Sequence, residues 1–537
     1  MIPISKEPLF NVAACKEFFC LRFPYFSSLN ILNLLSGCNL ISTTRIIRNA
    51  SLLGVAQAVS MAAGFISTAW IARALGPEGY GVLGFAVAFG SYFALATVFG
   101  TDLFGTREIA SAPDRAHTLV SRILGTRILL LVCAVFLYLL SVWIIDRSQD
   151  VTIVLLIQII VLISSAITID FLFQAHQRMG PIALRQMGAA MAAMIAVVFL
   201  VQSHNDLYIA AAIPCSAMLI SAVFLALFAD RRIERLRISF SRTGIKDVLI
   251  SSAPIMLSGV MSTVLLNVDV VMLGFIRTAE EVGIYAGMAR LFVLSTFAAH
   301  IISAAFAPAL AAESDKEDRR RIYYRYIRIL IFIGAPLSAA IVAFPEWLVI
   351  LVFGAGYLEG ARILALLGFA AVLSHLTIAP LTALIAWRDQ TAQMIILTAV
   401  AISNVALNFC LIPIYGGIGA GIATLIAQAL MLGLLVYRVR SKFGFFGFAP
   451  AAGAIGCAGV AFIVVIFAAK LLSGADGFSS DWTLPLLMVF AGSGIYIGFT
   501  LFFGVVRRGD VIALTYVLRN RDSDSRNLNE TDRTDGD

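Results

Sequence analysis

Long apolar stretches, separated by short polar or glycine-rich breaks, run along most of the chain. A run of about 20 apolar residues is long enough to cross the hydrocarbon core of a bilayer as a helix. The pattern therefore predicts an all-α integral membrane protein with about fourteen transmembrane helices. The predicted spans are 50–73, 80–103, 119–145, 151–175, 179–201, 206–229, 248–276, 284–310, 327–352, 360–386, 391–413, 417–437, 447–471 and 483–506.

Composition supports this interpretation. Hydrophobic residues make up 60% of the chain and charged residues only 13%, and the mean hydropathy is +0.92. A soluble globular protein is about a quarter charged. The net charge of +7 need not indicate a nucleic-acid partner, because cytoplasmic loops of membrane proteins carry an excess of Lys and Arg.

The distribution of Lys and Arg predicts the orientation of the chain. With the N-terminus inside, about 33 basic residues fall in inner segments and about 5 in outer ones. Both termini are then cytoplasmic. The basic loops 231–246 and 316–328 favour contact with anionic lipid headgroups, although they could also attract a diphosphate-bearing lipid.

One sharp break in the apolar pattern recurs. "GPEGYGVLGFA" (76–86) joins the first two spans, and "AEEVGIYAGMA" (279–289) joins the seventh and eighth. Glycine suits the turn, and Tyr80 and Tyr285 suit the interface where the second helix enters the membrane. The two tyrosines are 205 positions apart (285 − 80), which is close to six spans. The recurrence indicates two six-helix halves in the same orientation with a cavity between them; the alternative is two unrelated interfacial turns.

The chain is accordingly divided into six segments. These are an N-terminal cytoplasmic extension or the product of a start codon assigned too early (1–44), an N-terminal six-helix lobe (45–230), a basic cytoplasmic linker (231–247), a C-terminal six-helix lobe (248–440), transmembrane helices 13 and 14 (441–506), and a polar cytoplasmic tail (507–537).

Four stretches carry a resemblance to a known family. They are "ARALGPEGYGVLGFAVAF", "LFGTREIA" (103–110), "VDVVMLGFIRTAEEVGIYAGMARL" (268–291) and "NVALNFCLIPIYGGIGAGIATLIAQ" (404–428). Together they resemble the polysaccharide flippase family of the multidrug/oligosaccharidyl-lipid/polysaccharide (MOP) exporter superfamily, whose fold is MATE-like. The similarity extends over residues 45–440.

The resemblance implies a transporter of the inner (plasma) membrane that works by alternating access and is not an enzyme. Its substrate would be a polyprenyl-pyrophosphate-linked oligosaccharide, moved from the inner to the outer leaflet for O-antigen or exopolysaccharide synthesis. Its partners would then be membrane lipids, the polysaccharide polymerase and the chain-length machinery.

Two other transporters of this superfamily remain alternatives. One is a lipid II flippase. The other is a cation-coupled multidrug antiporter, which would have carboxylates in the cavity of its first half, where this chain has Asp102 and Asp170 only near the inner ends. Short outer loops disfavour a glycosyltransferase, and neither a GxxxxGK[ST] motif nor a Cys/His cluster is present. No cofactor or metal is expected.

Ionisable residues within spans are candidates for function, because a charge in hydrocarbon is costly. Asp269 and Arg290 lie about eight and seven residues from the outer turn between spans seven and eight, hence at one depth of roughly 10–12 Å. They could form a buried ion pair that holds the hairpin together. Alternatively, Arg290 faces the cavity and attracts the pyrophosphate, and Asp269 tunes it.

Further candidates lie on other spans. Asn404 and Asn408 are one helical turn apart and could bond to a neighbouring helix or to sugar hydroxyls. His300 and His375 are mid-span, as packed residues or as a proton relay.

A last group of candidates lies near the inner ends of spans two and four. Asp102, Arg107, Asp170 and Gln174 could form the rim of the inward mouth or an ordinary interfacial cluster.

Overall fold

The computed structural model describes residues 40–233, 235–444 and 494, and in these ranges all regular structure is helical. Residues 1–39, predicted span 447–471 and, apart from residue 494, predicted span 483–506 lie outside these ranges. The helices are α3 (Leu40–Val98), α4 (Thr101–Ser111), α5 (Ala116–Ile145), α6 (Gln149–Ile167), α7 (Asp170–Ala175), α8 (Met179–Leu200), α9 (Leu207–Arg232), α10 (Arg242–Ile276), α11 (Ala279–Ala312), α12 (Lys316–Ala343), α13 (Pro345–Val352), α14 (Ala361–Ala386) and α15 (Gln390–Phe443), with short 3-10 helices η1 (Pro113–Arg115), η2 (His204–Asp206) and η3 (Ala355–Gly360).

Ten helices in the described ranges are long and apolar enough to cross a membrane. Two of them have double length: α3 has 59 residues and α15 has 54. At 1.5 Å per residue each would be about 80 Å long if straight, more than twice the hydrocarbon thickness. Each is broken at one glycine of positive φ, Gly76 (70°) and Gly416 (56°). The predicted break after the first span is therefore confirmed.

Three predicted spans were drawn too long. Span 80–103 ends at Val98, and α4 begins only after Gly100, whose φ of 71° belongs to the left-handed region. Span 151–175 is interrupted after Ile167, and α7 follows as a separate short helix. Span 327–352 ends at Ala343, because Pro345 has no N–H to continue a helix and instead starts α13.

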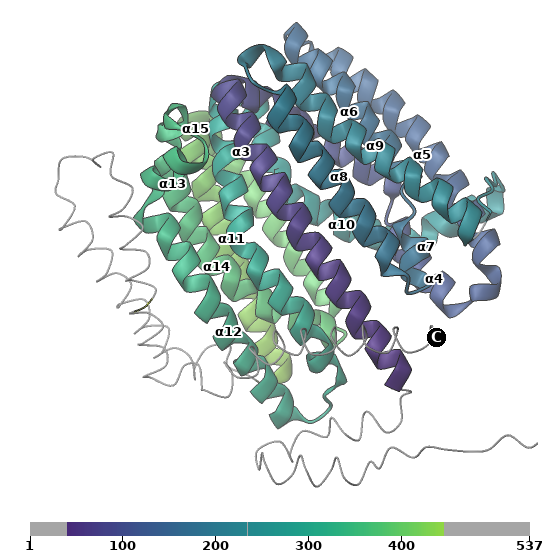
Figure 1. Ribbon diagram of the computed structural model, residues 1–537. Helices are drawn as coiled ribbons and strands as arrows, with labels where there is room; N and C mark the ends of the chain where they lie inside the picture. Colours follow the sequence, from purple (N-terminus) through teal and green to yellow (C-terminus); the bar gives the residue numbers. More distant parts are fainter. Residues whose placement is uncertain (1–39, 234, 445–493, 495–537) are drawn as a thin grey trace, which may run out of the picture.

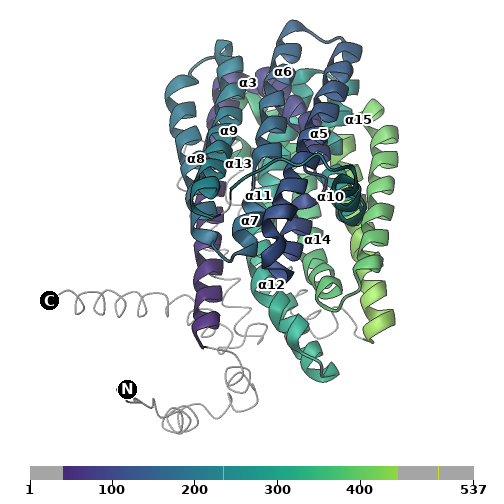
Figure 2. The ribbon, with the colours of Figure 1, turned by 90° about the vertical axis from the view of Figure 1, so that its right-hand side faces the viewer.

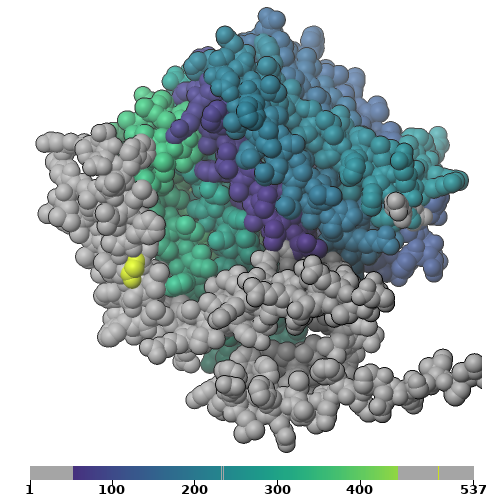
Figure 3. Space-filling model, viewed as in Figure 1, coloured from purple at the N-terminus to yellow at the C-terminus, as the bar shows by residue number. Residues whose placement is uncertain are grey.

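The long helices gather in two groups. Figure 1 shows α5, α6, α8 and α9 on one side of the molecule and α11, α12, α14 and α15 on the other. The amino-terminal half of α3 runs between the groups, and Figure 3 shows it on the surface along their boundary. Figure 2, turned by 90°, shows α10 near α15. Below, α3–α9 are the first group and α10–α15 the second group.

Buried apolar residues form three clusters, which lie at different positions between the outer and inner ends of the long helices. The kinks of α3 and α15 mark what we call the outer end, the end that the charge pattern predicts to be outside. There, one cluster joins both groups, with members such as Ala72, Tyr138 and Leu273. At the opposite, inner end lie two separate clusters, around Phe171 in the first group and around Tyr326 in the second. The Phe171 cluster also includes one residue of the second group, Val248 of α10. The extensive shared core is therefore at the outer end.

The two recurrent breaks meet at this shared core. A Cβ on Gly81 would lie 1.7 Å from the carbonyl oxygen of Ala279, and a Cβ on Gly283 would lie 1.8 Å from that of Pro77. Gly81 follows Pro77 by four residues, and Gly283 follows Ala279 by four. The contacts are therefore symmetric with an offset of 202 (283 − 81), rather than the 205 of the tyrosines.

The interfacial role predicted for the two tyrosines is wrong. Tyr80 is 8% exposed and Tyr285 only 2%. Both rings belong to the shared core instead of facing headgroups. The glycines, not the tyrosines, are the positions that the two breaks have in common in space.

The inner end of the second group is fastened by one loop carboxylate. Asp389 accepts a hydrogen bond from Arg438 Nε at 2.8 Å and pairs with Lys442 Nζ at 3.0 Å. Hydrogen bonds from Arg438 and Lys442 hold the pKa of Asp389 below its usual range. The loop before α15 is thereby tied to that helix's last turns.

Candidate functional site

A buried polar cluster lies within the second group and is centred on Asp269 of α10. The carboxylate accepts hydrogen bonds from Tyr285 Oη of α11 at 2.5 Å and from Thr424 Oγ1 of α15 at 2.7 Å. Asn408 Nδ2 of α15 donates a third at 2.5 Å and also contacts Asn404 Oδ1 at 3.2 Å. Asn408 thus bonds across to α10, whereas the hydrogen bond of Asn404 is to Asn408 on the same helix.

The hydrogen-bond donors to Asp269 in this cluster are all neutral groups. Asp269 is 7% exposed, Asn404 2% and Asn408 0%. Hydrogen bonds from neutral donors stabilise a buried carboxylate. Three such donors converge on Asp269. Asn408 Oδ1 is buried without a hydrogen-bond partner in the described structure, so an unused acceptor remains beside the carboxylate.

The predicted Asp269–Arg290 ion pair is not formed in the described structure. Asp269 is bonded by Tyr285 and by α15, whereas Arg290 is exposed. Two residues at the same depth in the membrane make contact only if their helices are rotated so that the side chains point toward each other. Arg290 follows Tyr285 by five residues, which is about 140° around α11, so the two side chains leave the helix in different directions.

Arg290 has a different neighbour. Its charge acts on the hydroxyl of Tyr80, a residue of α3 in the first group. Among the residues that the structure describes, no carboxylate forms an ion pair with it. Arg290 is thus an exposed cation on α11, within electrostatic range of α3 in the other group.

Two of the predicted inner-mouth residues are ion-paired by arginines that the sequence analysis did not single out. Arg127 of α5 is fully buried, and its Nη2 lies 2.5 Å from Asp102 Oδ1. Its Nε donates to Thr101 Oγ1 at 2.7 Å, and its guanidinium lies 5.1 Å from the Phe171 ring centroid. Asp170 pairs with Arg185 Nη2 at 2.6 Å.

The other two inner-mouth candidates are less engaged. Gln174 Oε1 accepts from Thr106 Oγ1 at 3.3 Å, which links α7 to α4. Arg107 is exposed. The four residues lie on α4 and α7, which Figure 1 shows together at one end of the first group.

The two candidate histidines differ in environment. His375 is 2% exposed, with Nδ1 2.6 Å from the Ala371 carbonyl and Nε2 3.2 Å from that of Ser295. It also packs against Gly334, where a Cβ would lie 2.2 Å from the ring. His300 is exposed. The geometry of His375 is that of a packed, hydrogen-bonded residue.

Arginines at the outer end reach from the first group to the second. Arg73 of α3 donates to the carbonyls of residues 350–352, which end α13, with Nε 2.9 Å from Val352 O. Arg147 donates to the last carbonyls of α10, with Nη2 2.8 Å from Gly274 O. A cation at a helix C-terminus satisfies carbonyls that have no partner in the helix. Arg73 and Arg147 therefore connect the two groups, whereas Arg277 bonds carbonyls of α15 within the second group.

Several residues that bond the predicted site residues were not identified as their partners from the sequence. Arg127 could have been found, because it is an ionisable residue inside predicted span 119–145. Thr424 and Tyr285 carried no such signal, since hydroxyl groups are common in transmembrane helices. No group of three or more His, Cys, Asp or Glu residues suited to a metal occurs in the described ranges.

Comparison with known proteins agrees with this architecture. Residues 46–314, half of the chain, match the family described as "Polysaccharide biosynthesis protein". A relative from Escherichia coli (strain K12), named "Putative O-antigen transporter", is 20% identical over 401 residues, which is 74% of this chain and 97% of that protein.

Two solved structures share the fold. The lipid II flippase MurJ in an inward closed conformation is similar with a TM-score of 0.65 and 16% identity, over 84% of this chain and 98% of that one. A MATE-family multidrug resistance transporter of the MOP superfamily, inward-facing, gives a TM-score of 0.56 and 16% identity, over 71% and 95%. The chain is thus a multi-pass membrane protein with a MOP-type fold, and it belongs to the polysaccharide biosynthesis protein family of flippase-type transporters.

Proposed function

We propose that this protein flips a polyprenyl-pyrophosphate-linked oligosaccharide from the inner to the outer leaflet of the plasma membrane, for O-antigen or exopolysaccharide synthesis. A diphosphate cannot cross hydrocarbon unaided, because burying an unpaired charge is prohibitively costly. The headgroup would cross between the two helix groups, shielded by protein, while the polyprenyl chain stays in lipid. The charge pattern supports cytoplasmic termini.

The observation that carries this proposal is that the core shared by the two groups and the separate clusters lie at opposite ends of the long helices. An extensive core joins both groups at the outer end, whereas at the inner end the clusters are separate, with Val248 of α10 as the one second-group residue in the cluster of the first group. Such an arrangement suits alternating access, in which two rigid bodies rock about a substrate site and open one side at a time. The state described would be closed outside.

Within this proposal, Arg290 is the residue that binds substrate. It is exposed, lies near Tyr80 of the opposite group and has no ion-pair partner among the described residues. An arginine can grip a phosphate with two parallel hydrogen bonds. Asp269, held by Tyr285, Thr424 and Asn408, would keep the second group rigid, or respond to a coupling cation during transport.

A flipping assay tests the proposal. Purified protein is reconstituted into liposomes that carry a polyprenyl-diphosphate oligosaccharide in both leaflets, and a glycosidase is added outside. Without flipping, only outer-leaflet lipid is cleaved; with flipping, cleavage proceeds to near completion. We expect wild-type protein to flip and Arg290→Ala to lose most of the activity, because the charge-assisted bonds are lost. Arg290→Lys should retain part of it.

Arg362→Ala is the matched control, since Arg362 is also exposed but lies at the start of α14. Elution as a single species would show that each variant folds. If Arg290→Ala flipped at the wild-type rate, Arg290 would not be the substrate residue. Flipping of lipid II alone, or efflux of cationic dyes without glycolipid flipping, would contradict the proposed substrate.

A further inference from the structure

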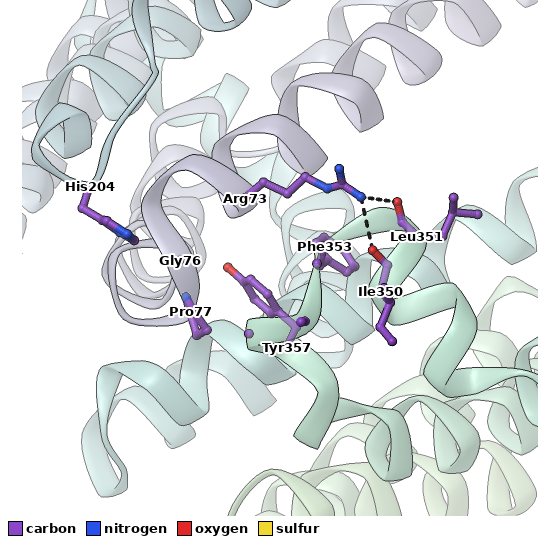
Figure 4. Close-up of a pocket in the computed structure, with 11 residues that line it drawn as sticks. Arg73, Gly76, Pro77, His204, Ile350, Leu351, Phe353 and Tyr357 are labelled. Atoms are coloured by element: carbon purple, nitrogen blue, oxygen red, sulfur yellow. Dashed lines mark hydrogen bonds between the residues drawn. The ribbon is translucent and has the colours of Figure 1, made fainter. Parts of the chain in front are cut away.

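A cavity of about 820 Å³ lies at the outer end of the boundary between the two groups. Its walls are Arg73, Gly76, Pro77 and His204 from the first group and seven residues between 350 and 357 from the second. Figure 4 shows Arg73 and His204 on either side of the Gly76–Pro77 break, with Ile350, Leu351 and Phe353 across from them. The break in α3 therefore forms one wall of a cavity between the groups.

The cavity is cationic. Arg73 donates Nε and Nη2 to the carbonyls of residues 350–352, and these acceptors are neutral. No Asp or Glu is among the lining residues. The positive charge of the guanidinium is therefore uncompensated within the cavity, and a neutral carbonyl is a weaker acceptor for it than an anion.

His204 places a second nitrogen at the same wall. Its Nδ1 lies 2.6 Å from the carbonyl oxygen of Leu75, and a carbonyl only accepts, so Nδ1 carries the hydrogen. Nε2 is left on the other edge of the ring, where it donates to an anion in the protonated form of the imidazole, in which both nitrogens carry hydrogen. A Cβ on Gly76 would approach Cε1 of His204 to 3.0 Å, so glycine allows the ring to lie against the backbone beside the cavity.

The remaining lining is largely apolar. Ile350, Leu351 and Phe353 come from the end of α13 and the residue after it, and Pro77 faces them from α3. A cationic edge beside an apolar wall is complementary to a molecule with a phosphate at one end and a hydrocarbon chain at the other. It is less suited to a free sugar, which would need many hydroxyl partners.

We propose that this outer cavity binds a phosphate group attached to an isoprenoid chain, with Arg73 and His204 as its ligands. The inference rests on the proposed function, because flipping would deliver such a lipid diphosphate to the outer leaflet. A phosphate oxygen outcompetes the carbonyls of residues 350–352 for the Arg73 guanidinium. Its arrival would therefore detach Arg73 from the end of α13 and loosen the contact between the groups.

A protection assay tests the site. In a background in which the seven native cysteines are replaced by Ser, Ala355→Cys places one thiol on the exposed cavity wall. The protein is reconstituted into liposomes and treated from outside with a membrane-impermeant maleimide. Farnesyl diphosphate should slow labelling, whereas farnesol and inorganic diphosphate at the same concentration should protect much less.

Variants then identify the ligands. Arg73→Ala and His204→Ala should each raise the farnesyl diphosphate concentration needed for half-protection by about tenfold, as expected for the loss of one charge-assisted hydrogen bond. Arg73→Lys keeps the charge and should lie between. Arg147→Ala is the matched control: it removes another arginine that bonds carbonyls across the boundary but lies outside the cavity, and it should protect like wild type.

Absence of protection, equal protection by farnesol or by inorganic diphosphate, or protection unchanged in both Arg73→Ala and His204→Ala would overturn the proposal. The flipping assay separates this failure from that of the proposed function. Flipping without protection at Ala355→Cys would reject the outer site alone. Protection without flipping would keep the site and reject the function.

Discussion

At the scale of single residues, the two partners of a buried ion pair can differ in their access to water. Arg127 is fully buried, whereas 47% of the Asp102 side chain remains exposed. If Arg127 is removed, the carboxylate can be solvated where it stands. If Asp102 is removed, the guanidinium stays buried without its counter-charge, which is the costly case.

This asymmetry gives a prediction. Asp102→Ala should destabilise the protein by about 3 kcal/mol, and Arg127→Met by clearly less, about 1 kcal/mol, because its packing is largely kept. The double variant should be more stable than Asp102→Ala alone. Unfolding of purified protein in mixed detergent micelles, followed by circular dichroism, provides the free energies. A larger loss for Arg127→Met than for Asp102→Ala would contradict the argument.

At the scale of elements, two helices of opposite groups touch through their backbones. Gly81 on α3 and Gly283 on α11 leave no room for a side chain at their crossing. Small residues let membrane helices approach closely, and the gain is van der Waals contact rather than polar bonding. A contact of this kind closes tightly and yet contains no strong bond that must be broken before it opens.

Adding one methyl group at this crossing should therefore hold the outer end apart. In Gly81→Ala and Gly283→Ala the new Cβ would lie under 2 Å from an opposing carbonyl oxygen, so the helices must separate. We expect a longer distance between spin labels at Ser148→Cys and Glu359→Cys, measured by pulsed electron paramagnetic resonance in a background without native cysteines. Gly188→Ala and Gly433→Ala, with open space around them, should leave it unchanged. An unaltered distance in both crossing variants would show that the outer end does not depend on this contact.

At the scale of the whole molecule, transport by rocking requires the outer core to come apart in every cycle. The structure offers a position at which that step can be blocked. A Cβ on Gly84 would lie 3.2 Å from Cβ of Ala286, and a disulfide needs about 3.5–4.5 Å between Cβ atoms. A shift of a few tenths of an ångström would join the two groups covalently.

The variant carrying both Gly84→Cys and Ala286→Cys should therefore lose flipping when oxidised and regain it with a reductant. Each single variant should be insensitive to oxidant, which makes the pair its own control. The liposome assay measures the rates, and mobility on a denaturing gel before and after reduction measures cross-linking. Wild-type flipping by fully cross-linked protein would mean that the outer core stays closed during transport.

The helical elements and their breaks could be predicted from the sequence, because apolar run length and glycine position determine them locally. The position of Asn404 and Asn408 on one face of a helix followed from their spacing. The partner of Asp269 did not follow, because depth in the membrane is a sum of residue rises, whereas contact also depends on how each helix is rotated by its neighbours. For the same reason Arg127 and Thr424 were missed as partners of Asp102 and Asp269.

The apolar outer core also affects how readily ions could leak across the membrane through this protein. A carrier large enough for a glycan headgroup could let protons and sodium ions leak whenever it rests open to the cytoplasm. In the described structure, the outer end below its cavity is closed by apolar side chains and by two glycine backbones in direct contact. Such a seal leaves no continuous file of water along that crossing, so a cell could hold many copies of the protein without discharging its membrane potential.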